Sequence, residues 1–318
     1  MKSVTLSLLQ SAANAFDFGG PVLCDAHHYG EGHINDTFVA WREDYSKRFI
    51  LYDGFLFPPM ENLLTHLKTK NFQNRTVGLM ENVCGVTRHL RAKILAEGGD
   101  PARETLNVIP TLSGSTCYLD ADGGAWRAYD FVEDTICLQQ VGSETDFRTV
   151  AETLGKFQNQ LEDYPASTLH ETIARFNDTP NRYANFEKAL SADALGRAKN
   201  IAPEVAFIHA REQDCHVLLD QLAAGEIPLR VTHNDTKINN VLIDAATGKG
   251  ICVIDLDTVM PGLSAYDFGD SIRTGANDCA EDEPDQSKVH FDLHLYEVFA
   301  KGYLSTAGAS MSMAEKKS

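Results

Sequence analysis

Short apolar runs separated by turn residues dominate the first part of the chain, a pattern typical of β-strands. The clearest runs are residues 37–41, 48–52 and 107–110. One helix interrupts them, because apolar residues recur at i, i+4, i+7, i+11 and i+15 between Leu79 and Ile94. A shorter helix-like stretch covers residues 4–16. The pattern therefore predicts a β-rich region with one long amphipathic helix.

After Asp134 the periodicity becomes helical. One apolar stripe joins Val150, Leu154, Phe157 and Leu161, and a second runs through residues 205–222. Three short strand-like segments follow at residues 228–232, 240–243 and 250–256. They bracket the densest polar cluster of the chain. The second part is therefore predicted to be mainly helical, with short strands around a polar loop.

Composition narrows the class of protein. The 318 residues carry 28 Lys and Arg against 45 Asp and Glu, a formal net charge of −17 that repels nucleic acid. Seven scattered cysteines without a CxxC pair argue against a disulfide framework or a zinc cluster, and are expected to fill small apolar sites. The chain has no signal-peptide pattern and no run of ~20 apolar residues that could span a membrane. We expect a cytoplasmic protein with neither nucleic acid nor membrane as a partner.

The polar cluster has the order of a kinase catalytic loop followed by a metal-binding strand. Residues 232–240 read THNDTKINN, and residues 253–257 read VIDLD. Asp235 lies two residues after His233 and five before Asn240, and Asp255 follows an apolar run. Phosphoryl transfer needs a carboxylate that accepts the proton of the attacking hydroxyl and oxygen ligands that hold Mg²⁺. This spacing predicts Asp235 as the base and Asn240 and Asp255 as the metal ligands.

Two readings of these polar positions compete. Asn, Asp and Thr are also common turn residues, so an isolated His-x-Asp would indicate only a turn. The combined loop, spacing and flanking apolar strands favour the catalytic interpretation. A second signal is the segment Gly30 to Phe38, in which Gly30 and Gly32 would let backbone amides approach the phosphates of a nucleotide. Alone it would be a hairpin turn.

Together the two signals predict a two-lobed, protein-kinase-like α+β fold that uses ATP and Mg²⁺. The β-rich N-lobe would comprise residues 1–133 with the glycine-containing loop. The mainly helical C-lobe would comprise residues 134–318, with the catalytic loop and the metal strand. The glycine loop lies in the first lobe and the catalytic loop in the second, which is the order that such a kinase requires.

These motifs resemble the aminoglycoside phosphotransferase superfamily and, within it, the N-acetylhexosamine 1-kinase group. The wording of residues 233–240, 254–262, 266–273 and 30–38 carries the resemblance, and residues 79–83 and 176–180 extend it over most of the chain. It implies a small-molecule kinase with a sugar as acceptor. One such scaffold serves aminoglycosides, choline, amino-alcohols and sugars, so the fold does not decide the acceptor.

Further roles follow from the resemblance alone. Residues 129–133 resemble the hinge that holds adenine, which makes Phe131 and Glu133 candidate nucleotide-binding positions. His233 is expected to pack under the catalytic loop, and Asp267 to brace it by hydrogen bonds. Asp257 would be a further carboxylate of the metal site or a structural cap.

By the same resemblance, His33, Arg273, Thr274 and Asn277 would face the acceptor. This set contains a cation and neutral hydrogen-bonding groups but no carboxylate, which suits a neutral N-acetylated sugar such as N-acetylglucosamine or N-acetylgalactosamine. An aminoglycoside would need carboxylates for its ammonium groups. The acidic run at residues 281–285 would reverse this expectation if it folded inward.

The chain departs from its relatives at two places. After residues 48–51 the relatives continue Gln-Arg-Ile-Asn, whereas this chain reads YDGFLFPP, so no strand lysine for the phosphates is apparent and Glu81 lacks the partner it would have. Residues 311–318 form a polar end where relatives continue into further helices, as if the chain were truncated. Both departures make an inactive, nucleotide-binding kinase-fold protein the alternative to an enzyme.

Overall fold

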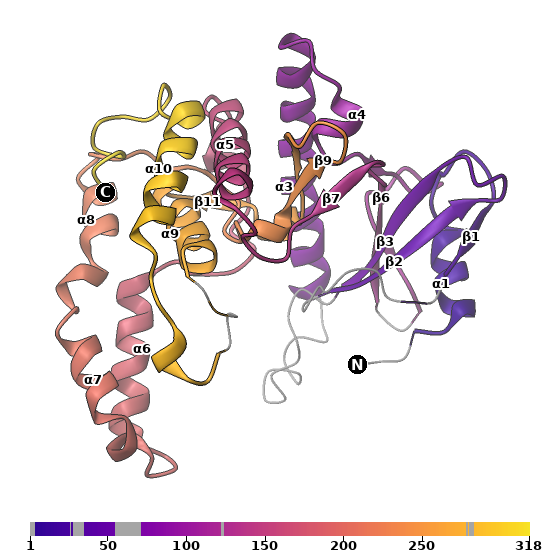
Figure 1. The fold of residues 1–318 in the computed structure, drawn as a ribbon. Helices are drawn as coiled ribbons and strands as arrows, with labels where there is room; N and C mark the ends of the chain where they lie inside the picture. The colour runs from indigo at the N-terminus through magenta and orange to yellow at the C-terminus, as the bar shows by residue number, and fades with distance from the viewer. Residues whose placement is uncertain are drawn as a thin grey trace.

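The computed structural model describes residues 4–25, 27, 35–54, 71–121, 124–277, 279 and 283–318. An antiparallel sheet forms the N-terminal region, and helices with two small sheets form the C-terminal part (Figure 1). Helix α3 (Asn71–Ala96) lies between the two. The arrangement is α+β, as the alternation of strand-like and helix-like segments predicts. The boundary at residue 133/134 stays a prediction.

The N-terminal sheet has the strand order β1-β2-β3-β6-β4, and β5 also pairs with β6. Every pairing in it is antiparallel. The strands are β1 (Val22–Cys24), β2 (Asn35–Arg42), β3 (Arg48–Gly54), β4 (Val108–Ile109), β5 (Tyr118–Leu119) and β6 (Ala125–Asp130). The three runs expected as strands therefore correspond to β2, β3 and β4.

The two faces of this sheet differ in what they contact, because successive side chains of a strand point to opposite sides. One face packs with α1 (Leu6–Ala13) around a cluster that includes Leu51, Trp126 and Ala128. On β6 the alternate positions, Arg127 and Tyr129, belong to the opposite face, which is turned toward α3 and the C-terminal part. A charged residue on that face is therefore directed toward the interior of the protein.

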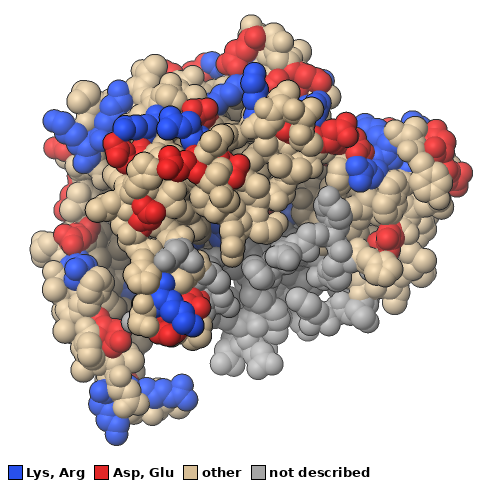
Figure 2. Space-filling model, viewed as in Figure 1, with Lys and Arg blue, Asp and Glu red and all other residues tan. Residues whose placement is uncertain are grey.

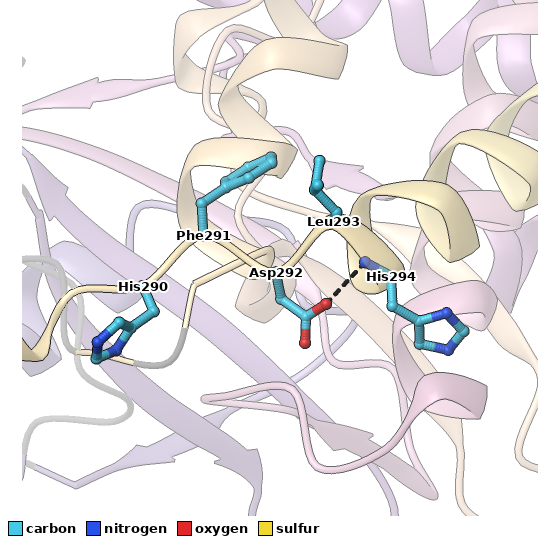
Figure 3. Close-up of a pocket in the computed structure, with 5 residues that line it drawn as sticks. All are labelled: His290, Phe291, Asp292, Leu293 and His294. Carbon is cyan, nitrogen blue, oxygen red and sulfur yellow. Dashed lines mark hydrogen bonds between the residues drawn. The ribbon is translucent and has the colours of Figure 1, made fainter.

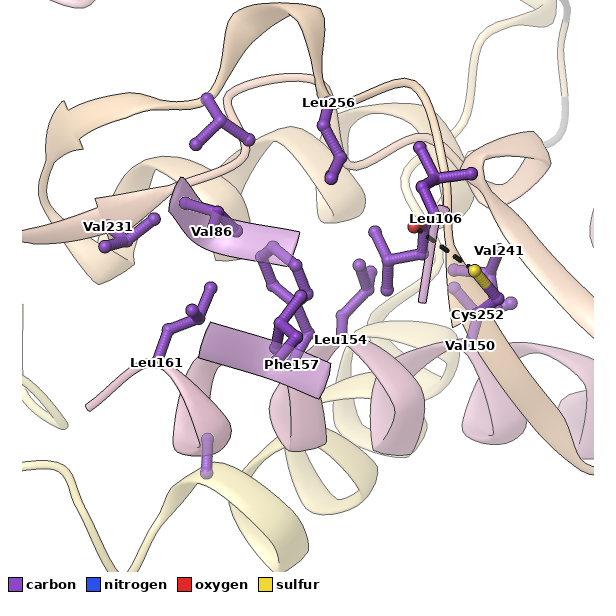
Figure 4. Packing of buried hydrophobic residues seen from close by; sticks show 14 of the residues in the cluster. Val86, Leu106, Val150, Leu154, Phe157, Leu161, Val231, Val241, Cys252 and Leu256 are labelled. Atoms are coloured by element: carbon purple, nitrogen blue, oxygen red, sulfur yellow. Dashed lines mark hydrogen bonds between the residues drawn. The ribbon is translucent and has the colours of Figure 1, made fainter. Parts of the chain in front are cut away.

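Helix α3 carries the predicted apolar stripe into the main core. Leu79, Val83, Val86, Leu90 and Ile94 are all buried. They pack with residues of α5 (Glu144–Gln160) and of the strands around the polar loop, as Figure 4 shows for Val86, Leu154 and Val241 among others. One core thus joins the long helix to the elements that carry the polar loop.

Two small antiparallel sheets hold the polar loop. One has the order β10-β9-β7, and the other pairs β11 with β8. Their strands are β7 (Thr135–Cys137), β8 (Arg230–Thr232), β9 (Val241–Asp244), β10 (Gly250–Val253) and β11 (Met260–Gly262). The remaining helices of this part are α4 (Pro101–Glu104), α6 (Thr179–Ala192), α7 (Ala202–His209), α8 (Val217–Ala223), α9 (Ser264–Gly275) and α10 (Leu293–Ala307).

Two sequence expectations need correction. The apolar stripe at residues 205–222 is not one helix: α7, a short 3-10 turn and α8 divide it, and none of their residues is fully buried. The cysteines fill apolar sites only in part: Cys252 is buried and Cys24, Cys84 and Cys117 pack against the apolar clusters, whereas Cys137 is exposed. The polar end at residues 311–318 packs onto the protein, because Glu315 is buried and forms an ion pair with Arg230 of β8 at 2.5 Å.

Charge on the described surface is mixed. On the face in Figure 2, acidic and basic side chains lie side by side over the upper part of the molecule, and a basic group marks the tip of the arm formed by α6 and α7. Within the described ranges no helix is long and apolar enough to cross a membrane.

Helices α5 and α10 approach closely at two glycines, and this contact gives a testable prediction. A methyl group at Gly155 would lie 2.5 Å from the carbonyl oxygen of Tyr303, which is backbone and cannot rotate away. Gly155→Ala should therefore lower the free energy of unfolding by about 1–3 kcal/mol. The matched control is Gly269→Ala on α9, where nothing lies within 4 Å of the added methyl and helix propensity favours alanine. A thermal melt in which both variants unfold at the wild-type temperature would contradict the close contact.

Candidate active site

The polar loop runs from the end of β8 to the start of β9, and two short strands hold its first end. Thr232 closes β8 opposite Met260 of β11, so His233 begins directly at the strand end. At the other end, residues Ile238–Asn240 form a 3-10 turn that passes into β9. The positions that the sequence singles out thus lie at the edge of the two small sheets, close to the N-terminal sheet.

Asp267 on α9 braces the loop through two successive backbone amides. His233 N donates to its Oδ2 at 2.9 Å, and Asn234 N donates to its Oδ1 at 2.7 Å. Asn234 has a φ of +67°, a left-handed conformation that asparagine tolerates better than most residues. Burial raises the pKa of Asp267 to about 6, while His233 and the two amides act in the opposite direction. One carboxylate therefore fixes the turn that presents the next residue, Asp235.

His233 is fully buried beneath the loop. Its Nδ1 accepts from Asp235 N at 3.2 Å, and its Nε2 lies 2.8 Å from the carbonyl oxygen of Ile254. A ring that accepts at Nδ1 and donates from Nε2 is the neutral tautomer, as inferred from this hydrogen-bond network. The histidine therefore links the loop to the strand that leads to Asp255.

Asp235 and Asn240 lie together across the loop. Asn240 Nδ2 donates to the backbone oxygen of Asp235 at 2.7 Å and to its Oδ2 at 3.3 Å. Lys237 Nζ lies 3.6 Å from Asp235 Oδ1, and about a quarter of the Asp235 side chain is exposed. The carboxylate is thus held in place and still open to a ligand. Lys237 was not among the residues that the sequence analysis selected.

Asp255 joins this pair from the strand that follows. Ile254 N donates to the backbone oxygen of Asn240 at 2.9 Å, which brings the two segments side by side. Asp255 has a left-handed conformation with φ +58° and begins the 3-10 turn Leu256–Thr258. Burial raises its pKa to about 7, and the neighbouring charges of Asp257 and Asp235 add to the shift. Carboxylates that repel one another in a buried position form a place where a cation is favourable.

The oxygen ligands that Asn240 and Asp255 offer fit Mg²⁺ better than a metal ion that needs all of its ligands from the protein. Asn240 uses its amide nitrogen toward Asp235, so its carbonyl oxygen is the group left for a cation, and Asp255 adds a carboxylate. Among the described residues no group of three or more His, Cys, Asp or Glu side chains could hold a metal. Mg²⁺ is commonly bound by one or two protein oxygens together with water and phosphate oxygens. The two residues would then complete their coordination with a nucleotide.

Arg127 is a residue of this site that the sequence analysis missed. It lies on β6, and its guanidinium forms a hydrogen-bonded ion pair with Asp257, both side chains being about nine-tenths buried. An arginine within the apolar strand AWRAYD was the signal that could have revealed it. Glu81, considered as the partner of a phosphate-binding lysine, instead pairs with His170 on the surface at 2.6 Å.

The hinge-like segment after β6 makes several contacts with Arg48 and Arg103. Phe131 N donates to the carbonyl oxygen of Arg48 at 3.1 Å, and Arg103 donates to the carbonyl oxygen of Glu133 at 3.0 Å. The Glu133 carboxylate accepts from Arg48 at 2.9 Å, and the same guanidinium lies 4.1 Å from the centre of the Phe131 ring. A nucleotide base held here would use other backbone groups or displace these bonds.

The segment assigned to the acceptor lies at the C-terminal end of α9 and is connected to the catalytic loop. Arg273 donates to Asp270 Oδ1 at 2.8 Å, and Thr236 N donates to Asp270 Oδ2 at 2.8 Å. Thr274 and Asn277 use their side chains within the same helix end, with Asn277 Nδ2 donating to the carbonyl oxygen of Arg273. The carboxylate of Asp270 therefore lies beside this segment and is bound by Arg273.

An open pocket of about 360 Å³ adjoins this segment, lined by residues 290–294. It is joined to the segment by a β-bridge between Asn277 and Phe291 and by a 2.9 Å bond from Asp292 N to the carbonyl oxygen of Ala276. Figure 3 shows the side chains of His290, Asp292 and His294 on one side of the chain and those of Phe291 and Leu293 on the other. The Asp292 carboxylate caps α10 by accepting from His294 N at 2.8 Å.

Gly30, Gly32 and His33 lie outside the described residues, so their predicted roles stay predictions. The acidic run at residues 281–285 is described only from residue 283 onward. Asp235, Asn240 and Asp255 converge at one place, with His233 and Asp267 supporting them. Phe131 and Glu133 lie at the end of β6, where the segment leaves the N-terminal sheet.

Comparison with known proteins identifies a family and several structures of similar fold. Residues 86–302, about two thirds of the chain, match the phosphotransferase enzyme family. The fold is similar to an aminoglycoside phosphotransferase from Alicyclobacillus acidocaldarius, with a TM-score of 0.60 and 12% identity over 96% of this chain and 79% of that one. It is similar to a microcompartment-associated aminopropanol kinase, with a TM-score of 0.56 and 15% identity over 98% of this chain and 83% of that one.

A third similar structure is a spectinomycin phosphotransferase in complex with ADP and spectinomycin. Its TM-score is 0.50 and its identity 14%, over 95% of this chain and 80% of that one. At these identities the likeness concerns the fold alone. It confirms the predicted kinase-like α+β class, with a β-sheet N-terminal region and a helical C-terminal part.

Proposed function

Because the chain belongs to the phosphotransferase enzyme family, we propose that it transfers the terminal phosphoryl group of ATP to a hydroxyl of a small molecule. The observation that carries this proposal is the convergence of Asp235, Asn240 and Asp255. Asn240 donates to Asp235 at 2.7 Å, and the backbone bond from Ile254 to Asn240 places Asp255 beside them. The arrangement has an open carboxylate next to two buried oxygen donors, as phosphoryl transfer requires.

In this proposal Asp235 orients the acceptor hydroxyl and accepts its proton. Its backbone amide is fixed by His233 and its carboxylate by Asn240, so the base does not need to reorganise when the acceptor binds. Lys237 Nζ lies 3.6 Å from the same carboxylate. Its positive charge would therefore lie near the negatively charged phosphoryl group during transfer. Asp267 is a positioning residue, because it holds the amides of the turn that carries Asp235.

Asn240 and Asp255 would hold Mg²⁺, which supplies charge compensation for the nucleotide phosphates when bound. The raised pKa of Asp255, caused mainly by burial and then by Asp257 and Asp235, supports this role, since a buried anion among anions is relieved by a cation. We place residues 1–133 as the nucleotide-covering lobe and residues 134–318 as the catalytic lobe. Gly30, Gly32, Phe131 and Glu133 are the proposed nucleotide-binding positions.

For the acceptor we propose an N-acetylated hexosamine, phosphorylated on its anomeric hydroxyl. The wording of residues 233–240 and 254–262 supports it. Of the proposed acceptor residues His33, Arg273, Thr274 and Asn277, the last three are described, and the charges near them support it as well. Asp270 is already bound by Arg273, and the nearby Asp292 is occupied as a helix cap. These carboxylates are therefore not available for the ammonium groups of an aminoglycoside, whereas a neutral sugar needs only hydrogen-bonding groups.

The acceptor is tested by a panel of candidate substrates. Purified protein with ATP and Mg²⁺ should release ADP with N-acetylglucosamine or N-acetylgalactosamine and give a sugar 1-phosphate, but should not release it with kanamycin or choline. The product is identified by ³¹P NMR. The proposed function as a kinase stands if any acceptor supports ADP release, and the sugar proposal fails if only kanamycin, choline or an amino-alcohol does.

Two controls make the panel interpretable. ADP release without any acceptor measures hydrolysis by water and is subtracted. Nucleotide binding measured by titration calorimetry separates an inactive nucleotide-binding protein from one that binds no nucleotide. Binding of ATP without turnover on any acceptor would favour the inactive alternative over the enzyme.

A further inference from the structure

Strand β3 has no lysine that could serve as a cation for the nucleotide phosphates. The strand reads RFILYDG. On the next strand, β6, Arg127 pairs directly opposite Tyr52 of β3. Both side chains lie on the sheet face that is turned away from α1, toward residues 255–257. Among the described residues of this face, Arg127 is the buried cation.

The guanidinium of Arg127 is fixed at the proposed metal site. Its Nη2 donates to the Asp257 carboxylate, and its centre lies 5.1 Å from the ring centre of Tyr52. The charge of Arg127 also acts to lower the pKa of Asp255. Because Asp257 follows the proposed metal ligand Asp255 by two residues, the guanidinium lies beside the proposed metal site.

One donor of this group is left without a partner. The Nε of Arg127 is buried and has no hydrogen-bond acceptor among the described residues. Because the side chain is only 8% exposed, bulk water does not readily replace that acceptor. Buried donors of this kind are rare in native proteins, and each calls for an explanation such as a missing ligand. A phosphate oxygen could accept the hydrogen bond that this Nε does not make within the protein. The planar guanidinium of arginine also matches the geometry of a phosphate group.

We propose that Arg127 contacts the nucleotide phosphates and replaces the strand lysine that this chain lacks, with Asp257 as the counter-ion that holds it in place. The inference rests on the proposed function, because it assumes that a nucleotide binds beside Asn240 and Asp255. The cation for the nucleotide phosphates would then come from β6, because β3 has no lysine. The alternative is an ion pair that only joins the N-terminal sheet to residues 255–257.

The test compares nucleotides that differ only in their phosphates. Dissociation constants for ATP, ADP and adenosine are measured with Mg²⁺ by titration calorimetry on the wild type and on two variants. Arg127→Met alone would remove the cation that pairs with the buried Asp257 carboxylate and could unfold the protein. The Arg127→Met/Asp257→Asn double variant removes both charges and avoids this problem. Asp257→Asn keeps the arginine and separates its effect from that of the carboxylate.

We expect the preference for ATP over adenosine to fall about 10- to 100-fold in the double variant, the loss typical of a charge-assisted contact. Adenosine should bind as tightly as to the wild type, because it carries no phosphate. Asp257→Asn alone should lose less of the preference than the double variant, because the asparagine oxygen can still accept from Arg127 and the arginine charge remains. A purely structural ion pair would change stability and leave the preference unchanged, so this readout distinguishes the two roles.

The matched control is Lys156→Met/Glu104→Gln, which removes an ion pair of 2.9 Å between α5 and α4, away from the sheet face. It should keep the wild-type preference. A double variant at 127 and 257 with an unchanged preference, or Asp257→Asn with the same loss as the double variant, would overturn the assignment of Arg127. A wild type that binds no ATP would overturn the proposed function itself, and this inference with it.

Discussion

Asp235→Asn is expected to lower kcat about 10²- to 10⁴-fold without unfolding the protein, the range found when a general base is lost. An amide has nearly the same shape as the carboxylate and can still accept from Asn240 Nδ2. It cannot accept the proton of the acceptor hydroxyl. The backbone bonds from His233 and Asn234 to Asp267 do not involve the altered side chain, so the loop should keep its conformation.

The measurement is ADP release at saturating ATP and acceptor, with circular dichroism to verify the fold. The matched control is Asp220→Asn on the exposed surface of α8, which changes the net charge by the same amount and should keep wild-type turnover. Asp235→Asn with a rate near that of the wild type would rule out Asp235 as the base. The expected profile is a fall in kcat with ATP affinity largely preserved.

Asp255→Asn should abolish most Mg²⁺-dependent activity, with a loss of about 10²- to 10³-fold as for other single electrostatic contacts in active sites. Asparagine is the informative substitution here. The backbone of Asp255 has a φ of +58°, which asparagine adopts readily and which would strain alanine. The variant therefore removes the charge of the proposed ligand and leaves the turn in place. The readout is kcat as a function of Mg²⁺ concentration, and an unchanged dependence would exclude Asp255 as a ligand.

Stability supplies an independent check on the same variant. The pKa of Asp255 is raised from 3.8 to about 7 in the folded protein, mainly by burial. Between these values the unfolded chain has lost the proton and the folded chain keeps it, so without metal this residue lowers stability as the pH rises. Asp255→Asn does not titrate, and its free energy of unfolding should decline less from pH 5 to pH 8. Loss of activity by unfolding would instead give a variant less stable than the wild type at pH 8.

Periodicity predicted the elements that pack against a core on one side. The stripes of α3 and α5 and the alternation of β2 and β3 are visible because burial forces apolar residues to recur at fixed spacing. The prediction of one helix over residues 205–222 was wrong. The apolar positions there have the spacing of one helix, but the chain turns at residues 213–215, and none of these apolar side chains is fully buried. The spacing of apolar residues along the chain does not show whether an apolar helix face packs against another element.

For the candidate site, sequence spacing found the residues that lie near one another along the chain. Asp235 and Asn240 are five residues apart, and Asp255 comes two residues after the adjacent strand β10. Arg127 could not be found in this way, because its partner Asp257 is 130 residues away and the pairing depends on how the two parts of the protein pack. The same holds for Asp270, whose contact with Thr236 joins two elements 34 residues apart.

The ion pair between Arg230 and Glu315 has a consequence for how the protein acquires its site during synthesis. Strand β8 leads directly into His233, yet it is held by Glu315 and by the carbonyl oxygen of Ser310, residues that follow 85 and 80 positions later. Such distant contacts form late, because the intervening chain must first be ordered. On the ribosome, the N-terminal sheet can assemble long before residues 310–315 emerge. The catalytic loop, by contrast, reaches its final support only after those residues have been added.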